Sequence, residues 1–230
     1  MTNIILIPGS GHGGWGYDPI SDNLRSLGHK VFALTLTGLD HEKTETKAIN
    51  LDTHIQDVLD VIEAENLENI FIVGHSYGGM VVTGVADRTK AKVEGLFYID
   101  AVLPKPGQRQ WDTLDGEMLE GFIASSLDGL NIYPSPEFKA YRPRVMPHPL
   151  ATMMQPLNYS ESSLDVKDKT YIYAEKFFGI PGQISPFERI YKELSKRDDW
   201  HTYSLPYGHD IFEEAPEVVF DLIVEALARL

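Results

Sequence analysis

Ser76 stands in a sequence pattern that can make a serine hydroxyl reactive. Residues 69–80 read NIFIVGHSYGGM, in which a run of β-formers leads into the pentapeptide GHSYG and then into a helical pattern. A residue at so sharp a strand-to-helix turn adopts strained backbone geometry, and flanking glycines relieve the crowding. The strain is useful where the hydroxyl must stand clear of the sheet edge, as in the G-x-S-x-G nucleophile elbow. The pattern therefore predicts a nucleophile that still needs a base, an acid and an oxyanion hole.

His209 is the best placed of the eight histidines to be the base. It follows the last predicted strand, in PYGHDIFEEAP, and ligand chemistry in open parallel sheets gathers at the carboxyl ends of strands. His12 falls at the same end, where we expect it to order the first loop by hydrogen bonding. His75 is interpreted as a packing or loop-orienting residue. The other histidines are interpreted as surface or structural residues: His29, His41, His54, His148 and His201.

The first loop, PGSGHGGWGYD over residues 8–18, can bring backbone N–H groups close to a ligand. Successive glycines remove Cβ interference, as an oxyanion hole requires. A phosphate-binding loop is the rival interpretation. However, the chain has no G-K-[ST], and GSGHGG misses the dinucleotide spacing G-x-G-x-x-G. No acidic residue closes the second predicted strand either, so the sequence disfavours nucleotide binding.

Short apolar runs alternate with amphipathic segments along the chain. Strands are predicted at 3–8, 30–36, 69–74, 93–100, 169–174 and 200–206, and helices at 17–27, 51–66, 78–89, 186–197 and 215–229. Near-continuous apolar strands separated by helices indicate a parallel sheet that is covered on both faces. The predicted fold class is therefore α/β, a doubly wound and mostly parallel sheet.

One interval, from about 103 to 166, breaks this alternation. It contains no convincing strand, and six prolines fall between Pro134 and Pro156. It also carries large apolar residues: Trp111, Phe122, Phe138, Tyr141, Met146, Met153 and Met154. We interpret it as a small cap inserted after the strand that ends near Asp100, since long insertions of this kind are usually functional. The predicted division is a core of residues 1–102 and 167–230 and a cap of 103–166.

Composition excludes several classes of function. The net charge of −14 over 230 residues repels phosphate backbones and anionic bilayers, so we expect no nucleic-acid partner and no membrane partner. There are no cysteines, which removes disulfides, thiol nucleophiles and Cys-based metal sites. The first residues, MTNIILIPGS, lack the basic region of a signal peptide. We therefore expect a cytoplasmic protein without a metal or cofactor, and a homodimer is compatible with the sequence.

The glycine-rich loop, GHSYGG and the late GHD together resemble the α/β-hydrolase superfamily. In more detail, PGSGHGGWGYDPISDNLRSLGHKV is similar to the N-terminal segment of plant methylesterases, hydroxynitrile lyases and their bacterial relatives. The resemblance covers nearly the whole chain and is weakest across the cap. It implies Ser76 as nucleophile and His209 as base, the same residues that the sequence pattern indicates. It also implies an oxyanion hole made by the N–H groups of Ser10 and Tyr77.

The acid departs from the pattern of the plant enzymes. There an aspartate follows the penultimate strand, but here the stretch reads YIYAEKFFGIPG and the matching residue is Phe177. Glu175, two residues earlier, is one substitute. Asp100 is the other, because haloalkane dehalogenases of the same superfamily can carry their acid after this strand. Asp100 is favoured because it keeps the chain order serine, acid, histidine.

These residues predict a serine hydrolase, most simply a carboxylesterase that acts on a small, largely apolar ester through an acyl-enzyme. Dehalogenase chemistry needs a carboxylate where Ser76 stands. Hydroxynitrile lyases carry a lysine after the histidine and a hydroxyl residue in the first loop, where this chain has Asp210 and Gly9. A ligand receptor, a lyase, a perhydrolase and a lactonase remain alternatives. Three cap arginines are interpreted as solvated or paired with nearby acids, or as clamps for a substrate carboxylate: Arg109, Arg142 and Arg144.

Overall fold

A six-stranded parallel sheet forms the centre of the molecule, with the strand order β2-β1-β3-β4-β7-β8. The computed structural model describes residues 1–40, 48–114, 116–176 and 185–230. The strands are β1 (Asn3–Ile7), β2 (Lys30–Ala33), β3 (Ile70–His75), β4 (Val93–Ile99), β7 (Asp168–Lys176) and β8 (His201–Gly208). Each predicted strand corresponds to one of them, so the doubly wound parallel sheet is confirmed. The second strand ends at Ala33, earlier than predicted.

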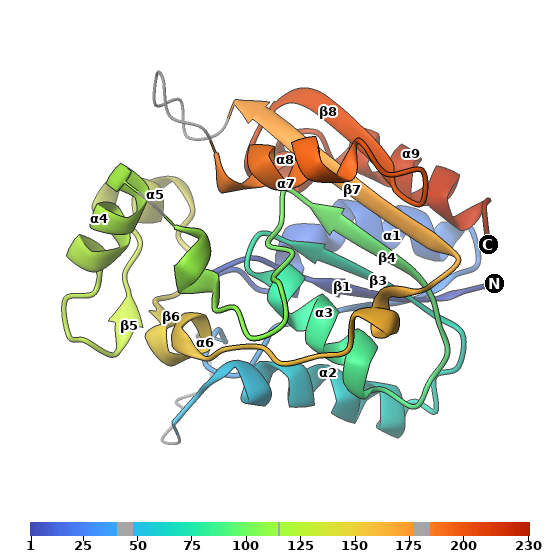
Figure 1. The fold of residues 1–230 in the computed structure, drawn as a ribbon, viewed down its shortest axis with the longest axis horizontal. Helices are drawn as coiled ribbons and strands as arrows, with labels where there is room; N and C mark the ends of the chain where they lie inside the picture. Colours follow the sequence, from blue (N-terminus) through green and yellow to red (C-terminus); the bar gives the residue numbers. More distant parts are fainter. Residues whose placement is uncertain (41–47, 115, 177–184) are drawn as a thin grey trace.

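The central strands β1, β3 and β4 are apolar on both faces, and each face of the sheet packs against its own helices (Figure 1). Ile5 and Ile72 belong to one buried cluster, while their neighbours Ile4 and Phe71 belong to the other. The first cluster includes side chains of α2 (Leu51–Ala64), α3 (Gly78–Arg88) and α7 (Pro186–Leu194). The second includes side chains of α1 (Asp18–Ser26) and α9 (Pro216–Leu227), which follows the short α8 (Ile211–Glu214). Alternate side chains of a strand thus bury in opposite directions, as the sequence pattern requires.

Most of the segment 103–166, which we call the cap segment, lies at the end of the sheet toward which the arrows of β4 and β7 point, and its last residues run back beside α3 (Figure 1). It holds short elements: η2 (Gln110–Thr113), α4 (Gly116–Ser125), β5 (Asn131–Ile132), α5 (Pro136–Tyr141), β6 (His148–Pro149), α6 (Leu150–Met154) and η3 (Glu161–Leu164). The prediction that it contains no strand is wrong, since β5 and β6 pair antiparallel. These strands have two residues each, too few for periodicity to reveal. Over the described ranges, no helix has the length and apolarity to cross a membrane.

We predict that Gly79→Ala destabilises the protein, because α3 begins in contact with the chain that follows β4. A Cβ at Gly79 would collide with the carbonyl oxygen of Val102. Overpacking of this kind costs about 1–3 kcal/mol. Gly121→Ala in α4 is the matched control, since no atom lies within 4 Å of a Cβ there and alanine favours helix by up to about 1 kcal/mol. Urea unfolding measures both; equal stability of the two variants would contradict the packing described here.

Candidate active site

Ser76 occupies the turn between β3 and α3 in a left-handed backbone conformation, with φ of 52°. Such a φ is unfavourable for a residue with a side chain, so the surrounding structure must hold it. The amide of Ser76 donates to the carbonyl of Ile99 at 3.2 Å, and its carbonyl accepts from Val102 at 3.0 Å and from Gly79 at 3.1 Å. The strained turn predicted from the pentapeptide is therefore present, and neighbouring β4 and α3 fix it.

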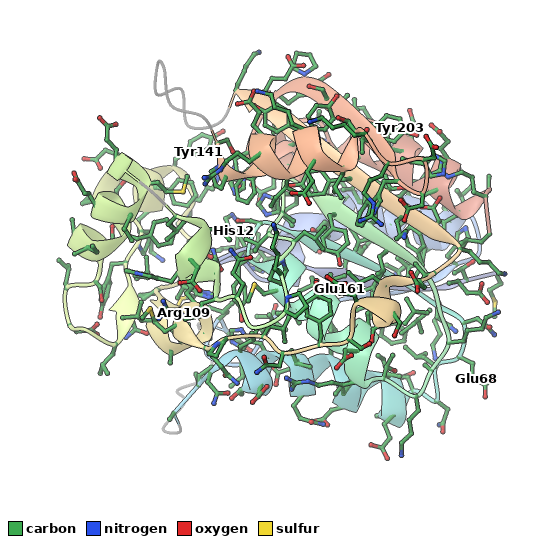
Figure 2. The ribbon with its side chains drawn as sticks, in the orientation of Figure 1. His12, Glu68, Arg109, Tyr141, Glu161 and Tyr203 are labelled. Atoms are coloured by element: carbon green, nitrogen blue, oxygen red, sulfur yellow. The ribbon has the colours of Figure 1, made fainter. Side chains whose placement is uncertain are left out.

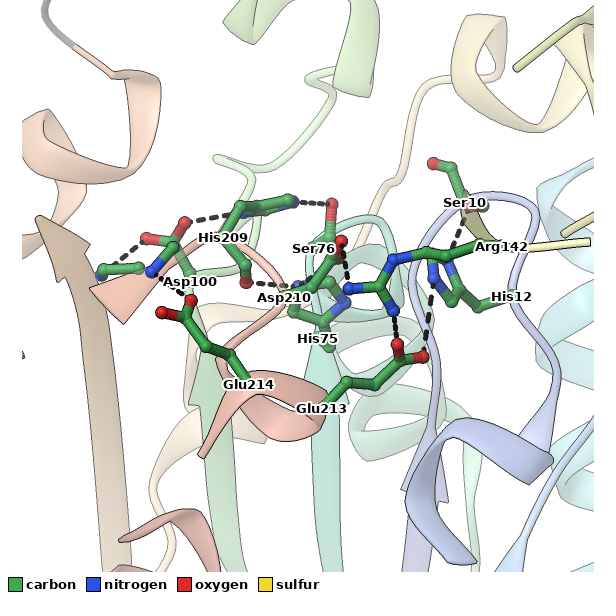
Figure 3. Close-up of polar contacts among 12 residues, drawn as sticks. Ser10, His12, His75, Ser76, Asp100, Arg142, His209, Asp210, Glu213 and Glu214 are labelled. Carbon is green, nitrogen blue, oxygen red and sulfur yellow. Dashed lines mark hydrogen bonds and ion pairs between the residues drawn. The ribbon is translucent and has the colours of Figure 1, made fainter. Parts of the chain in front are cut away.

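His209 lies between Ser76 and Asp100 and is hydrogen-bonded to both (Figure 3). Its Nε2 is 2.9 Å from Ser76 Oγ, and its Nδ1 is 2.6 Å from Asp100 Oδ2. With Nδ1 protonated, the histidine donates to the carboxylate and accepts from the serine hydroxyl. The ring of Phe187 stacks on the imidazole, with ring centroids 5.0 Å apart. The structure thus brings together three residues predicted from widely separated parts of the chain.

Asp100 is fully buried at the end of β4, where it too has a positive φ, 40°. Its amide donates to Ile172 at 2.7 Å, and its Oδ1 accepts from the amide of Ala174 at 3.1 Å. Glu175, the alternative acid, is exposed and accepts instead from Ser204 at 2.7 Å. Phe177, which matches the acid position of the plant enzymes, lies outside the described residues. The contact with His209 is therefore made by Asp100.

The charges around His209 change its acidity. Burial by itself lowers the pKa of His209, but the hydrogen bond and charge of Asp100, helped by Asp210, raise that pKa above its ordinary value. Burial likewise raises the pKa of Asp100, against the hydrogen bonds from His209 and Ala174. The pKa values of His209 and Asp100 are thus both raised, because the pair is stable when a proton lies between the imidazole and the carboxylate.

The first loop lies directly against Ser76. A Cβ at Gly9 would come within 2.9 Å of the Ser76 Cβ and 2.7 Å of His75 Nδ1, so a side chain at this position would displace the turn. The amides of Ser10 and Tyr77 donate no hydrogen bond to a described residue. They are thus available to a ligand oxygen, as the predicted oxyanion hole requires.

Two buried histidines bond to Tyr77 and to Gly11, the residue after Ser10. His148 of β6 accepts from the amide of Gly11 at 3.2 Å and contacts Thr152 of α6 at 2.8 Å. His54 lies 2.8 Å from the Tyr77 hydroxyl, and burial lowers the pKa of His54 to about 4. The structural role expected for both is therefore present, whereas His41 lies outside the described residues.

An ionic cluster lies beside His209, in which Arg142 of the cap segment is placed between Asp210 and Glu213 (Figure 3). Its guanidinium is 3.3 Å from Asp210 Oδ2 and also pairs with Glu213. Arg142 is thus paired with acids, as expected, although both acids are distant from it in sequence. Asp210 is therefore not an uncompensated negative charge. Arg109 pairs with nearby Asp112 at 2.6 Å, as expected.

His12 and His75 hold the loops on either side of this cluster. His12, which lies between the sheet and the cap segment (Figure 2), donates from Nδ1 to the carbonyl of Ser10 at 3.1 Å. His75 donates from Nε2 to the carbonyl of His209 at 2.9 Å. Burial lowers the pKa of both rings, so both are neutral. Their roles as loop-ordering residues agree with the expectation from the sequence.

One group in the described part of the chain has ligand atoms close enough for a metal ion. These atoms, of His75, His209 and Asp210, lie within 4.8 Å of one another. Both ring nitrogens of His209 already bond to Ser76 and Asp100, and Asp210 pairs with Arg142. The group therefore fits the ionic cluster better than a metal site.

A separate cavity of about 740 Å³ lies between α7 and the cap segment. Leu103, Ile190 and Trp200 contribute apolar walls, and Lys169, Arg189 and Arg197 contribute cations. None of Ser76, Asp100 and His209 lines it. The hydrogen-bonded residues, and not this cavity, therefore mark the candidate site.

Comparison with known proteins gives matches over the whole chain. The model of the alpha/beta hydrolase family matches residues 4–222. The carbendazim hydrolyzing esterase of a Nocardioides strain is 34% identical over 250 aligned positions, which cover 100% of both chains. Methylesterase 2 of Arabidopsis thaliana is 25% identical over 61% of this chain and 59% of its own.

Solved structures show the same fold. An extracellular alpha/beta-hydrolase from a Paenibacillus species superposes with a TM-score of 0.82 at 22% identity, covering 98% of this chain and 99% of that one. A pyrethroid hydrolase from Sphingobium faniae superposes with a TM-score of 0.73 at 24% identity, covering 97% and 96%. At these identities the likeness concerns the fold alone.

We predict that Asp100→Asn lowers the pKa of His209, because the variant removes the carboxylate charge and leaves the burial that favours the neutral ring. Glu175→Gln is the matched control and should leave the pKa unchanged, since Glu175 is exposed and bonds to Ser204. NMR titration of the His209 imidazole measures both. A shift in the control without a shift in Asp100→Asn would show that the glutamate is the partner.

Proposed function

The chain belongs to the alpha/beta hydrolase family, and we propose that it is a serine-dependent carboxylesterase acting on small, largely apolar esters. The observation that carries the proposal is the hydrogen-bonded row of Ser76, His209 and Asp100 at the carboxyl ends of the strands. Full-length similarity to an esterase supports the same reaction class. No step of this reaction requires a metal or an organic cofactor.

In the first half-reaction, His209 Nε2 removes the proton of Ser76 as Oγ attacks the ester carbonyl carbon. Asp100 keeps the imidazole in the required tautomer and stabilises the imidazolium that forms. The amides of Ser10 and Tyr77 bind the oxygen that becomes negative, and each donor contributes about 3 kcal/mol in comparable sites. The imidazolium then protonates the departing alcohol, which leaves an acyl-enzyme.

In the second half-reaction, water attacks the acyl carbon while His209 Nε2 accepts its proton. The same amides bind the second oxyanion. Collapse returns the proton to Ser76 Oγ and releases the carboxylic acid, so the enzyme is restored. Because the base must be neutral, the raised pKa of His209 places the acid limb of activity above the ordinary titration of histidine.

The alternative functions share this chemistry or lack turnover. A lactonase or perhydrolase would use the same serine and histidine, and a receptor would bind its ligand without hydrolysing it. No observation in the described residues favours them over an esterase. Cytoplasmic location and a homodimer stay predictions, which cell fractionation and light scattering in solution would test.

We expect the purified chain to hydrolyse p-nitrophenyl esters of short to medium acyl length, and Ser76→Ala to lose activity by a factor on the order of 10⁶. Carbendazim belongs in the assay because it is the compound named for the similar Nocardioides esterase. Ser195→Ala, at an exposed serine after α7, is the control and should keep full activity. An inert wild type, or an active Ser76→Ala, would contradict the proposal and favour the receptor or lyase alternatives.

We further expect Asp100→Asn to lower turnover by about 10⁴, because the imidazole loses the group that fixes its tautomer. Glu175→Gln should turn over at the wild-type rate. Initial rates on the best p-nitrophenyl ester measure this difference. The reverse order of the two variants would place the acid at Glu175, near the end of β7, instead of at Asp100 after β4.

A further inference from the structure

Arg142 connects the cap segment to the loop that carries His209. It follows α5, and on the cap side its guanidinium lies 5.7 Å from the centre of the Phe138 ring and 5.4 Å from that of Tyr141. On the core side it pairs with Asp210, which comes directly after His209, and with Glu213 in α8. The side chain of Arg142 is only 13% exposed, and those of the two acids are 15% and 20% exposed. One partly buried cation thus faces two partly buried carboxylates.

The carboxylate of Asp210 lies close to the reacting residues. One of its oxygens is within 4.8 Å of a ring nitrogen of His209, and another contact places it 3.9 Å from His75 Nε2. At this distance in a largely buried site, an uncompensated negative charge would favour protonated His209. It would also oppose the negative charge that develops on the substrate oxygen. Arg142 is placed to offset this carboxylate.

Glu213 extends the cluster toward the first loop. Its Oε1 is 3.7 Å from His12 Nε2, and the other nitrogen of His12 donates to the carbonyl of Ser10. Arg142 therefore stands between the loop that holds the base and the loop that holds a predicted oxyanion donor (Figure 3). Buried ion pairs are weak sources of stability, because desolvation offsets the attraction. A contribution to folding alone therefore does not account for this cluster.

We propose that Arg142 is a positioning residue supplied by the cap segment, which offsets the charge of Asp210 beside His209 and holds the His209 and Ser10 loops in register. The proposal rests on the esterase function proposed above. If Arg142 has this role, the pKa of His209 in the core depends on a residue of the cap segment.

The charged and titratable groups that face His209 come from several elements. They include Asp100 after β4, His75 of β3, His12 of the first loop, Asp210 and Glu213 beside α8, and Arg142 of the cap segment. His12 and His75 are neutral because burial lowers the pKa of each. Removal of Arg142 therefore leaves a net increase of negative charge near His209.

In Arg142→Met, we expect the acid limb of the kcat/KM profile to move up by about one pH unit. The uncompensated Asp210 keeps His209 protonated to higher pH, so kcat/KM should fall about tenfold on the acid side and recover toward alkaline pH. Arg142→Met with Asp210→Asn should move the limb back, because both charges of the pair are then absent. Arg142→Lys keeps the positive charge, so its acid limb should lie close to that of the wild type.

Arg109→Met is the matched control, since Arg109 belongs to the same cap segment (Figure 2) but pairs with Asp112. Its profile should equal that of the wild type. If Arg142→Met does not fold, Asp210→Asn alone tests the same charge and should move the limb to lower pH. An unchanged limb in every folded variant, or an equal loss at all pH values, would overturn the proposal.

NMR titration of His209 separates this proposal from the esterase function. In Arg142→Met the pKa of His209 should rise whether or not the chain hydrolyses esters. An inert wild type with this rise would defeat the esterase function and leave the electrostatic role of Arg142 standing. An active enzyme in which the pKa of His209 is the same with and without Arg142 would defeat the role of Arg142 alone.

Discussion

The row of hydrogen bonds through His209 depends on two residues, Ser76 and Asp100, that both hold left-handed backbone conformations at the ends of adjacent strands. Each conformation costs on the order of 1–3 kcal/mol, and only a rigid surrounding keeps it. Here that surrounding is the sheet itself, because the amide of Ser76 bonds to Ile99 and the amide of Asp100 bonds to Ile172. The parallel ladder thus continues one residue beyond β3 and β4, and its register sets how far apart the serine and the carboxylate lie.

The cap segment contributes contacts to the loops that carry the site residues. The amide of Met146 donates to the carbonyl of Gly11 at 2.8 Å, and His148 accepts from the Gly11 amide. Both groups of one glycine in the first loop are therefore fixed by the cap segment. With Arg142 on the opposite side, cap contacts hold both the loop of Ser10 and the loop of His209. A change in the cap segment can consequently alter the chemistry without touching the three central residues.

Local sequence patterns were sufficient to predict the parallel sheet and the strained turn that holds Ser76. The central strands β1, β3 and β4 are buried on both faces, so their apolar runs are nearly continuous, and the glycines around Ser76 mark a sharp turn. The resemblance to the α/β-hydrolase superfamily is confirmed by the family match over residues 4–222. The contacts of Arg142 and His148 could not be predicted in this way. Their partners, Asp210 and Gly11, lie in distant parts of the chain, and only the packing of the cap segment onto the core brings them together.

Both chain ends lie at the side of the sheet away from α4, α5 and α6 (Figure 1). This follows from the topology, because β1 starts at the amino edge of the parallel sheet and α9 runs back to that edge after β8. The molecule can therefore be immobilised on a solid support through either terminus with its reactive edge facing the solution. Fusion to a carrier protein at either end would likewise leave the approach of substrate open.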